Sequence, residues 1–412
     1  MSREAMLVTE EPLALGLKAG VGNVIDSSAH VPGSAFRGAL AARWIAQHGL
    51  PNRVAAPLRQ EFLKLFEGAI RYGPLYADGS MLEPLTVRRC KYEPEAGSHT
   101  TVDDAHSEQA ARCRVCGSPL ERGKGRVVGL TLGELTSVEL TVRETAASGK
   151  LFSRRHISPG TVLRGFIDGD HPWLQAVPEV LWIGGRRSVG GRARLTCRAA
   201  SPPRPEPRPD GQVLVRLEAP GIFVDDAGRP SLDFPVQEIG AALGVPVERA
   251  QSWTRPVTVS GWHAASNLPK PTDVALAAGS AVLLQPRKAV SVEALQRLSR
   301  TGLGLRRAEG FGWLAVNPPP WQPPPSTSVP REESAAVPLA AAVPDDLRNW
   351  LAPRLKEFAV QLEHAGCGRG EDITDRPRYR KAPQAAKDAV DQLLDLGVSA
   401  LNDAIVLLEE RP

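Results

Sequence analysis

Two stretches near the N-terminus place apolar residues at helical spacing and end in helix-stopping residues. The first runs from Ser34 to about His48 and is followed by Gly49, so we expect Ser34 to cap the helix and Gly49 to end it in a left-handed conformation. Arg37 falls off the apolar face, where it is available to solvent or a ligand. The second predicted helix covers 58–66 and stops at Gly68. The apolar residues of the first helix are Phe36, Leu40, Trp44 and Ile45, and those of the second are Leu58, Phe62, Leu65 and Phe66.

Strand-like patterns surround these helices and recur later in the chain. In the first 200 residues they cover 5–17, 126–143, 160–168 and 192–199. A later strand at 212–219 alternates apolar and polar residues, and a helix over 291–301 has Ser291 as its cap and Gly302 as its stop. Because strand, helix and closing strand occur in both parts, the pattern predicts an α+β fold of the ferredoxin-like kind, with helices on one face of an antiparallel sheet.

Proline-rich segments mark the expected domain boundaries. Residues 201–210 read SPPRPEPRPD, and 317–338 contain NPPPWQPPPSTSVP, so both are predicted to be stiff linkers. They divide the chain into domains at 1–200 and 211–316 and a tail at 339–412. The tail has the leucine, alanine and valine spacing of two packing helices, at about 345–365 and 383–409.

Composition favours a soluble protein with a possible polyanionic partner. Apolar residues make up 42% and charged residues 23%, no run of about 18 apolar residues occurs, and no signal peptide is recognisable, so we expect a cytoplasmic protein without membrane contact. The formal charge is +4, but the tail from Pro338 onward has 10 basic and 13 acidic residues. The preceding residues therefore carry +7, which fits nucleic acid binding and fits simple solubility equally well.

Two glycine–arginine loops close the two predicted domains. The first is GGRRSVGGRAR (184–194) and the second is GLGLRRAEGFGW (302–313). Glycines let backbone N–H groups approach a phosphate and arginines add bidentate charge, although a single loop of this kind is more often a turn that needs positive φ. Two copies at matching positions favour a polyanion. Neither loop has the spacing of a nucleotide-binding fingerprint, so no nucleotide cofactor is expected.

Four motifs of the chain resemble the RAMP superfamily of CRISPR proteins. HVPGSAFRGALAARW (30–44) resembles its opening motif, the two glycine–arginine loops resemble its G-loops, and TAASGKLFSRRHISPGTVLRGFI (145–167) is also similar. Within the superfamily the chain is most similar to the Cas-five-like subunit of type III-D complexes, the Csx-ten family. The similarity covers about residues 5–317 and leaves the tail unassigned.

The resemblance implies tandem ferredoxin-like (RRM-like) RAMP domains in a type III antiviral effector ribonucleoprotein. Such a subunit would bind CRISPR RNA near its repeat-derived 5′ tag, beside other RAMP subunits and a polymerase-like large subunit, and would meet target RNA indirectly. By matching motif, the residues expected against the RNA backbone are Ser34, Arg37, Gly38, Arg186, Arg187, Gly190, Gly191, Arg192, Arg306, Arg307, Gly310 and Gly312. For Ser34, helix capping alone is an equally good explanation.

A basic stretch between the two loops is a further candidate for RNA contact. Its side chains are Lys150, Arg154, Arg155 and His156, arranged around Phe152. Such a stretch can follow phosphates and stack on a base, or it can be a solvated loop without a ligand.

The cysteines indicate a metal site within an insertion at about 88–125. Cys113 and Cys116 form a CxxC followed by glycine, and Cys90 lies upstream. His99 or His106 would complete a tetrahedral set, and members of the resembled family have a cysteine, a histidine and a CxxCG in this order. We expect structural zinc on Cys90, His99, Cys113 and Cys116, with His106 as the alternative; the other reading is reduced cysteines in a surface insertion.

The chain offers no convincing catalytic constellation. His30, His156 and His263 adjoin motifs, but none is paired with a second catalytic group in the sequence. The expectation is a binding subunit without catalytic residues. One alternative is a metal-independent endoribonuclease that processes precursor CRISPR RNA, and another is a scaffold whose helical tail docks a partner.

Overall fold

The computed structural model describes residues 2–16, 24–92, 99–107, 110–140, 146–176, 179–184, 190–263 and 268–324, and a few positions between 351 and 390. Only the backbone is described at 24, 136–140, 146–152 and 263. The chain forms two units, Met1–Ser326 and Thr327–Pro412. In the second unit residues 353–358 are helical, and most of the two helices predicted for the tail lies outside the described residues. No helix in the described part of the chain is long and apolar enough to cross a membrane.

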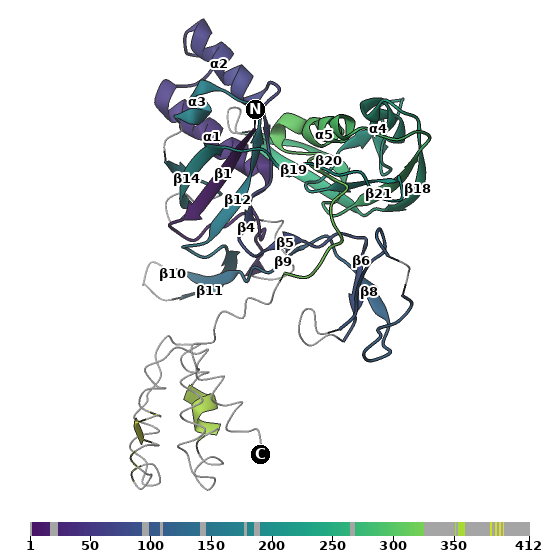
Figure 1. The fold of residues 1–412 in the computed structure, drawn as a ribbon. Coiled ribbons are helices and arrows are strands. Elements are labelled where there is room, and N and C mark those ends of the chain that lie inside the picture. Colours follow the sequence, from purple (N-terminus) through teal and green to yellow (C-terminus); the bar gives the residue numbers. More distant parts are fainter. Residues whose placement is uncertain are drawn as a thin grey trace. The chain divides into compact units, whose positions relative to one another are not determined.

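The first half of unit 1 is built on an antiparallel sheet around β1 (Ser2–Thr9), with helices packed on it (Figure 1). The sheet order is β13-β14-β1-β12-β3, and β4 also pairs with β12. These elements are β3 (Arg71–Tyr72), β4 (Tyr76–Ala77), β12 (Val162–Asp168), β13 (Val180–Trp182), β14 (Arg192–Ala199), α1 (Gly33–His48), α2 (Ala56–Phe66) and α3 (Pro172–Gln175). Alternate residues of β1, Ala5 and Leu7, are buried in one core with Phe36 and Trp44 of α1. The period-two pattern of the strand and the apolar face of the helix thus form this core.

The second half repeats this construction around β15 (Val213–Leu217). Its sheet order is β18-β21-β15-β22, all antiparallel. The other elements are β18 (Val247–Trp253), β21 (Ala281–Pro286), β22 (Leu314–Val316), α4 (Val236–Leu243) and α5 (Val292–Thr301). Leu295 and Leu298 of α5 are buried against Val215 and Leu217 of the central strand, as the apolar spacing predicts.

The two halves have the same strand order. In each half a helix follows the first strand and another follows the third, and the sheet reads fourth, first, third, second when its four main strands are numbered along the chain. The strands in question are β1, β3, β12 and β14 in the first half and β15, β18, β21 and β22 in the second. The structure therefore confirms an α+β architecture with helices on antiparallel sheets, built twice.

Each half also carries an insertion between its second and third main strands. In the second half this is the hairpin of β19 (Pro256–His263) and β20 (Leu268–Leu276). A separate pair, β16 (Phe223–Val224) with β17 (Pro230–Ser231), lies between the first main strand and α4. In the first half the insertion, residues 78–161, is longer. Its elements are β5 (Met81–Leu82), β6 (Val87–Cys90), β7 (Thr101–Asp103), β8 (Leu120–Arg122), β9 (Val127–Val128), β10 (Gly133–Leu140) and β11 (Ala146–His156), and β2 (Val24–Ile25) joins β11.

The proline-rich segments pack against the first insertion. In 201–210, Arg208 Nη2 donates to the carbonyl of Ala105 at 2.9 Å. In the other segment, the Trp321 side chain is buried and its Nε1 donates to the carbonyl of Leu82 at 3.0 Å, while its backbone N–H meets Asp103 Oδ2 at 3.0 Å. Prolines 318–320 and 323–324 thus flank an anchored tryptophan, and residues 325–338 of the predicted linker lie outside the described part.

The predicted helix ends are correct in part. Ser291 accepts a hydrogen bond from the N–H of Ala294, and Gly302 ends α5 with φ of 67°, as expected. Gly49 ends α1 with φ of 95°. The capping role of Ser34 is wrong, because α1 begins at Gly33 and Pro32 occupies the cap position without a side-chain hydrogen bond. The strand expected at 5–17 stops at Thr9, and that expected at 126–143 is divided into β9 and β10.

Candidate nucleic-acid interface and metal centre

The opening motif places its glycine, rather than its serine, at a contact that the fold requires. A Cβ on Gly33 would lie 2.0 Å from the carbonyl oxygen of Tyr72, whereas Ser34 is exposed. Gly38 is also exposed and has open space around it, so no contact requires glycine there. Ser34 and Gly38 therefore face solvent on the first two turns of α1.

Arg37 joins the two helices of the first half. Its Nε donates to the carbonyl of Phe66 at 2.7 Å, and its Nη2 lies 2.5 Å from Glu67 Oε1. The side chain is only 12% exposed. Arg37 thus satisfies a carbonyl at the C-terminal end of α2, where a cation is favoured, and the expectation that it is available to solvent or a ligand is wrong.

The second glycine–arginine loop packs on the first half of unit 1. Gly310 has φ of 90°, and a Cβ there would lie 2.8 Å from Cα of Gly33 and 2.7 Å from the carbonyl oxygen of Tyr72. Gly312 has φ of 62°, and a Cβ there would lie 1.8 Å from the carbonyl oxygen of Leu303. Glycine is required at both positions by backbone conformation and by close approach. The opening motif and the second loop, far apart in sequence, are therefore in direct contact.

The two arginines of this loop have different environments. Arg306 Nη1 lies 2.6 Å from Asp273 Oδ2, its Nη2 lies 2.8 Å from Glu309 Oε2, and its guanidinium stacks on Phe311. Its charge is paired with Glu309 of the loop and with Asp273 of β20, and its contact with RNA stays a prediction. Arg307 donates to the carbonyl of Thr301 at 3.3 Å and forms no ion pair among the residues that the structure describes.

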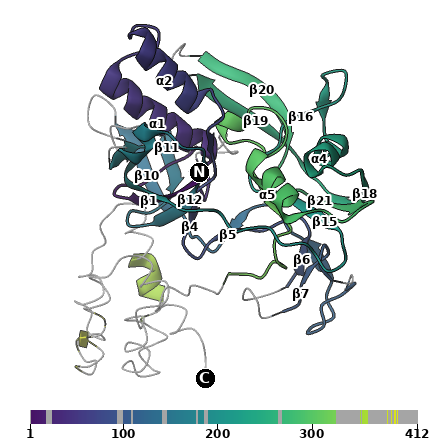
Figure 2. The ribbon, with the colours of Figure 1, turned by 45° about the horizontal axis from the view of Figure 1, so that its top comes forward.

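An open groove of about 910 Å³ lies beside Arg307, between α5 and the first half of unit 1. Figures 1 and 2 both show α5 next to the strands of the first half. The charged residues of the groove wall are Arg71, Arg297, Arg300, Arg306, Arg307, Asp168 and Glu293. Arg300 pairs with Asp168 at 3.1 Å. Since Arg306 is neutralised by residues outside the wall, Arg71, Arg297 and Arg307 face one remaining carboxylate, and the groove is basic.

Arg71 is a buried cation with unused hydrogen-bond donors. The residue is 6% exposed, and its guanidinium lies 4.6 Å from the ring centroid of Trp313. Its Nη1 donates to the carbonyl of Arg300, but Nε and Nη2 have no partner among the described residues. Burial lowers the pKa of Arg71 to about 10; Asp168 opposes this effect and the charge of Arg307 adds to it. Two guanidinium groups therefore repel each other at this wall, an arrangement that an anion between them would relieve.

The first glycine–arginine loop is described only at its ends. Arg186 and Arg187 lie outside the described residues. A Cβ on Gly190 would lie 2.7 Å from the carbonyl oxygen of Pro12, and the N–H of Gly191, with φ of 93°, donates to the same oxygen at 3.0 Å. Arg192 Nε pairs with Glu10 Oε2 at 2.8 Å. The described glycines thus serve close packing, those at 184 and 190 against the segment that follows β1, and Arg192 is paired with an acid.

The basic stretch Lys150–His156 is a strand, β11, rather than a loop. It pairs with β10 in a hairpin and with β2. Arg155 Nη1 lies 3.6 Å from Asp26 Oδ1, and Arg154 also has an interaction partner. Nδ1 of His156 is buried without a hydrogen-bond partner among the described residues. The side chain of Lys150 lies outside the described part. The alternative of a solvated loop is wrong for this stretch.

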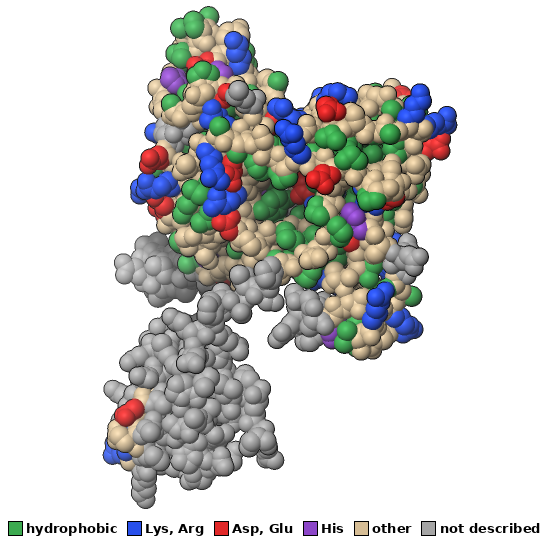
Figure 3. Space-filling model, viewed as in Figure 1, with side chains coloured by type: hydrophobic (Ala, Val, Ile, Leu, Met, Phe, Trp, Pro, Cys, Tyr) green, Lys and Arg blue, Asp and Glu red, His purple; other side chains and the backbone are tan. Residues whose placement is uncertain are grey.

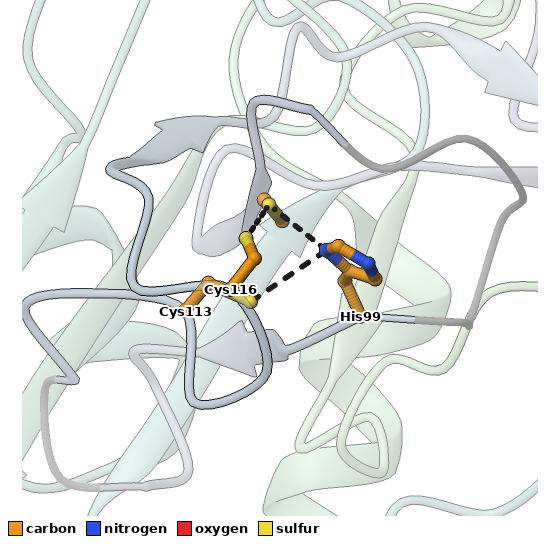
Figure 4. A group of neighbouring side chains, drawn as sticks. His99, Cys113 and Cys116 are labelled. Carbon is orange, nitrogen blue, oxygen red and sulfur yellow. Dashed lines mark hydrogen bonds between the residues drawn. The ribbon is translucent and has the colours of Figure 1, made fainter.

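Four residues of the first insertion converge as a candidate metal centre (Figure 4). The three thiols and Nδ1 of the histidine all lie within 4.8 Å of one another, and the residues are Cys90, His99, Cys113 and Cys116. Cys90 Sγ lies 3.4 Å from Cys116 Sγ and 3.3 Å from His99 Nδ1. These separations fit ligands around one tetrahedral ion, for which metal–sulfur bonds of about 2.3 Å and metal–nitrogen bonds of about 2.0 Å are usual. The cluster could hold a metal ion, and its members are the four that the sequence predicts.

The surroundings of the cluster act differently on two of its thiols, since burial raises the pKa of Cys90 to about 11 while that of Cys113 is lowered, and His106 is not part of the cluster. Burial opposes ionisation of Cys113, but hydrogen bonds from the backbone at Thr100, Cys116 and Val115 outweigh it and lower the pKa of this thiol to about 5. His106 lies elsewhere, with its Nδ1 3.1 Å from Arg208 Nη1. Cys90 comes from β6, His99 from the segment before β7, and the other two from the turn before β8, so one ion would tie these segments together.

Of the three histidines that adjoin motifs, His30 is partly buried. His30 Nδ1 lies 3.0 Å from Ser28 Oγ, and its ring stacks on Tyr76 with centroids 5.1 Å apart. Burial lowers the pKa of His30 to about 4. Among the acids, Asp103 is buried and accepts hydrogen bonds from Ala105 and Trp321, so it stabilises the insertion. The side chain of His263 lies outside the described part.

The groove residues other than Arg306 and Arg307 were not predicted from the sequence. Arg71 lies in a short strand without a motif, and Arg297 and Arg300 have the spacing of exposed helix residues. The one available signal is their position: both fall in the second half of a helix that leads directly into the second glycine–arginine loop. Gly33 belongs to the opening motif, but its contact with Gly310 depends on the packing of the two halves and could not be predicted from the motif.

A family model for "CRISPR-associated protein (Cas_Cmr3)" matches residues 137–316. The matched part includes the basic strand β11, both glycine–arginine loops and the whole second half of unit 1. No curated protein matches the chain.

Solved structures with partial similarity include two structures of a type III-B complex and one of a Cas6-related protein. The "Type III-B Cmr-beta bound to cognate target RNA" has a chain with 13% identity and a TM-score of 0.43, over 76% of this chain and 96% of that one. The same complex with target RNA and AMPPnP gives 14% and 0.42, over 68% and 86%. A "Cas6-related gene from Pyrococcus furiosus" gives 9% and 0.30, over 77% and 98%. Because all three TM-scores are below 0.5, nothing below rests on them.

Proposed function

We propose that this chain is a non-catalytic, RNA-binding subunit of a type III CRISPR effector ribonucleoprotein. The observation that carries the proposal is the basic groove, where Arg71, Arg297 and Arg307 share the wall with one remaining carboxylate. A groove of this size with excess positive charge suits a chain of phosphates, which arginine can bind in bidentate fashion. The match of residues 137–316 to a CRISPR-associated family supports RNA as the polyanion.

The motifs and the repeated strand order support the proposed subunit type. A βαββαβ order of fourth, first, third, second strand in both halves supports tandem ferredoxin-like RAMP domains. The finer assignment, to a type III-D-like subunit of the Csx-ten family, is supported by the motifs at 30–44 and 145–167. In that assignment the chain holds the repeat-derived 5′ tag of CRISPR RNA and contacts other RAMP subunits and the polymerase-like large subunit.

The metal in the insertion is proposed to be structural zinc. Three thiolates and one imidazole are a donor set that zinc prefers, and a full set of four protein ligands leaves no open position for a substrate. Zinc, when bound, supplies a tetrahedral cross-link. Cys90, His99, Cys113 and Cys116 hold it, and they thereby fix the three-stranded sheet β7-β6-β8.

We also infer that the chain binds RNA without cutting it. A histidine with its pKa lowered to about 4 is a weak base near pH 7, and the His30 ring is engaged with Ser28 and Tyr76. Arg155 and Asp26, near the basic strand, pair with each other. These contacts favour a structural role for the polar residues around the opening motif.

The test is binding of the purified full chain to CRISPR RNA. We expect affinity for RNA that falls steeply as salt rises, higher affinity for RNA with the 5′ tag than for the same RNA without it, and no cleavage in the presence of chelator. Fluorescence anisotropy with labelled RNA over a salt series, followed by gel analysis of the same RNA, measures all three. Absence of RNA binding at low salt would refute the proposal, and metal-independent cleavage of repeat RNA would replace it with processing activity.

A further inference from the structure

The first insertion carries a basic pocket of its own, of about 250 Å³, on the sheet that holds the metal ligands. Its lining residues are Glu83, Arg89, Cys90, Lys91, Glu121, Arg122, Lys124 and Arg126. Five of these are basic and two are acidic. Figure 3 shows basic side chains on the surface of the insertion, at the lower right. The pocket is therefore a second concentration of positive charge, on different elements from the groove.

The buried one of the two acids, Glu83, is already neutralised. Glu83 is 1% exposed, its Oε1 lies 2.7 Å from Arg89 Nε, and its Oε2 accepts the backbone N–H of Lys124 at 3.1 Å. Arg126 is more distant from Glu83, at 3.9 Å, and is 59% exposed. The Glu83–Arg89 pair thus forms the base of the pocket and leaves the outer cations with little compensation.

Those outer cations lie on the exposed side. Arg122 and Lys124 are exposed and form no ion pair among the described residues. Lys91 Nζ lies 3.9 Å from Glu121 Oε1, with both side chains about half exposed, a pair that contributes little in water. The net positive charge is therefore available to a partner.

The backbone that presents Lys124 is held rigidly by two glycines. A Cβ on Gly123 would lie 2.4 Å from the carbonyl oxygen of Pro84. Gly125 has φ of 58°, and a Cβ there would lie 2.5 Å from the carbonyl oxygen of Ala278, in the second half of unit 1. The turn is packed on both sides, so the backbone at Lys124 is fixed before any ligand binds. Such preorganisation reduces the entropy that binding costs.

An exposed aromatic ring lies next to these charges. Tyr92 is 63% exposed, and the Lys91 ammonium lies 5.5 Å from its ring centroid. Exposed rings beside lysine and arginine are typical of surfaces that bind single-stranded nucleic acid, where cations meet phosphates and a ring stacks on a base. Tyrosine is also common at protein interfaces, so the ring by itself does not separate RNA from an acidic polypeptide. The cations and the ring together suit single-stranded RNA, the polyanion of the proposed function.

We propose that this surface, the insertion face formed by Lys91, Tyr92, Arg122, Lys124 and Arg126, binds single-stranded RNA independently of the groove. The identity of the ligand as RNA rests on the proposed function. Cys90 lies between Arg89 and Lys91 in sequence, so a metal on the four-residue cluster would also hold the end of β6 that presents Lys91 and Tyr92.

The experiment uses the full chain with zinc and a fluorescein-labelled single-stranded oligoribonucleotide. The test variant reverses three charges, Arg122→Glu, Lys124→Glu and Arg126→Glu, and a second variant is Tyr92→Ala. The matched control reverses three exposed charges of the second half of unit 1, Arg249→Glu, Arg287→Glu and Lys288→Glu. Anisotropy over a salt series gives the affinity and its salt dependence, and thermal melting checks that each variant is folded.

The face variant is expected to bind at least about tenfold more weakly than the control, with a salt slope smaller by about 2, since each single-stranded phosphate contact contributes about 0.7 to the slope. Tyr92→Ala is expected to weaken binding about fivefold or more, with the slope unchanged, because stacking involves no counterion release. Equal affinity of the face variant and the control would overturn the inference.

Three further outcomes separate this inference from the proposed function and from a protein-docking surface. If reversal of Arg297 and Arg307 in the groove weakens RNA binding while the face variant binds like the control, the insertion face is wrong and the proposed function stands. If the wild-type chain binds no RNA, the proposed function fails first. Unchanged RNA binding together with lost binding of polyglutamate by the face variant would identify a protein-docking surface instead, and would also overturn the inference.

Discussion

Gly33, in the first turn of α1, and Gly310, in the second glycine–arginine loop, meet backbone to backbone. A Cβ on Gly33 would lie 3.0 Å from Cα of Gly310, and a Cβ on Gly310 would lie 2.8 Å from Cα of Gly33. The carbonyl oxygen of Tyr72 lies within the same contact, 2.0 Å and 2.7 Å from the two positions. This contact fixes α1 against the loop that carries Arg307, and so it helps set the position of the groove wall.

Alanine at either glycine is therefore expected to destabilise unit 1. Gly33→Ala and Gly310→Ala each insert a methyl group where backbone atoms lie, and Gly310 also has positive φ, so a loss of about 1–3 kcal/mol or more is expected. Urea unfolding followed by tryptophan fluorescence measures it. The control is Gly38→Ala on the same helix, which has open space and should stabilise by about 0.5–1 kcal/mol. Similar stability of all three variants would show that the close contact does not exist in solution.

Metal binding should depend on His99 and not on His106. His99 Nδ1 lies 3.3 Å from Cys90 Sγ, whereas His106 contacts Arg208. We expect one zinc per chain by metal analysis of the wild type and of His106→Ala, and loss of tight binding in His99→Ala and Cys113→Ser. Removal of zinc by chelator should lower the melting temperature of the wild type and of His106→Ala alike. Retention of zinc by His99→Ala would assign the fourth ligand to another residue.

The ion pairs of Glu309 with Arg306 and Lys270 predict a defined dependence of stability on pH. Although burial opposes ionisation of Glu309, hydrogen bonds from Arg306 and Lys270 lower its pKa to about 2, from an ordinary value of 4.5. Because the folded pKa is depressed, this contribution is complete above pH 4.5 and is lost as pH falls towards 2. Its size is on the order of 2 kcal/mol after allowance for partial exposure.

The measurement is the free energy of unfolding at several pH values between 2 and 6 for the wild type and Glu309→Gln. The wild type should lose more stability than the variant on acidification, because the variant has no carboxylate to protonate at this position. Parallel pH profiles would mean that the pairs of Glu309 with Arg306 and Lys270 contribute no net stability in solution.

The sequence predicted features that depend on local spacing. The apolar face of α1 and the Ser291 cap of α5 are confirmed, and the four side chains predicted as metal ligands lie together, because helix periodicity and the order of cysteines and a histidine act over short distances. The spacing of the residues left His99 and His106 open as the fourth ligand. The preference for His99 came from the order of cysteine, histidine and CxxCG in the resembled family.

Features that depend on which distant residues meet were not predictable. Arg37 and Arg306 look like available cations in their motifs, but they are neutralised by Glu67 and by Glu309 with Asp273. The same limit applies to Arg71, whose burial beside Trp313 arises only when the two halves pack together. A motif specifies which residue types are present, and the tertiary contacts decide which charges remain for a ligand.

The most direct test of the central claim is RNA binding after charge reversal in the groove. The variant carries Arg297→Glu and Arg307→Glu, and the control carries Arg287→Glu and Lys288→Glu on the same half of unit 1. With single-stranded CRISPR RNA, the groove variant should bind at least about tenfold more weakly than the control, with a salt slope smaller by about 1.4, corresponding to two lost phosphate contacts. The control should bind like the wild type. Equal affinities and equal salt slopes for the groove variant and the control would contradict the assignment of this groove to RNA.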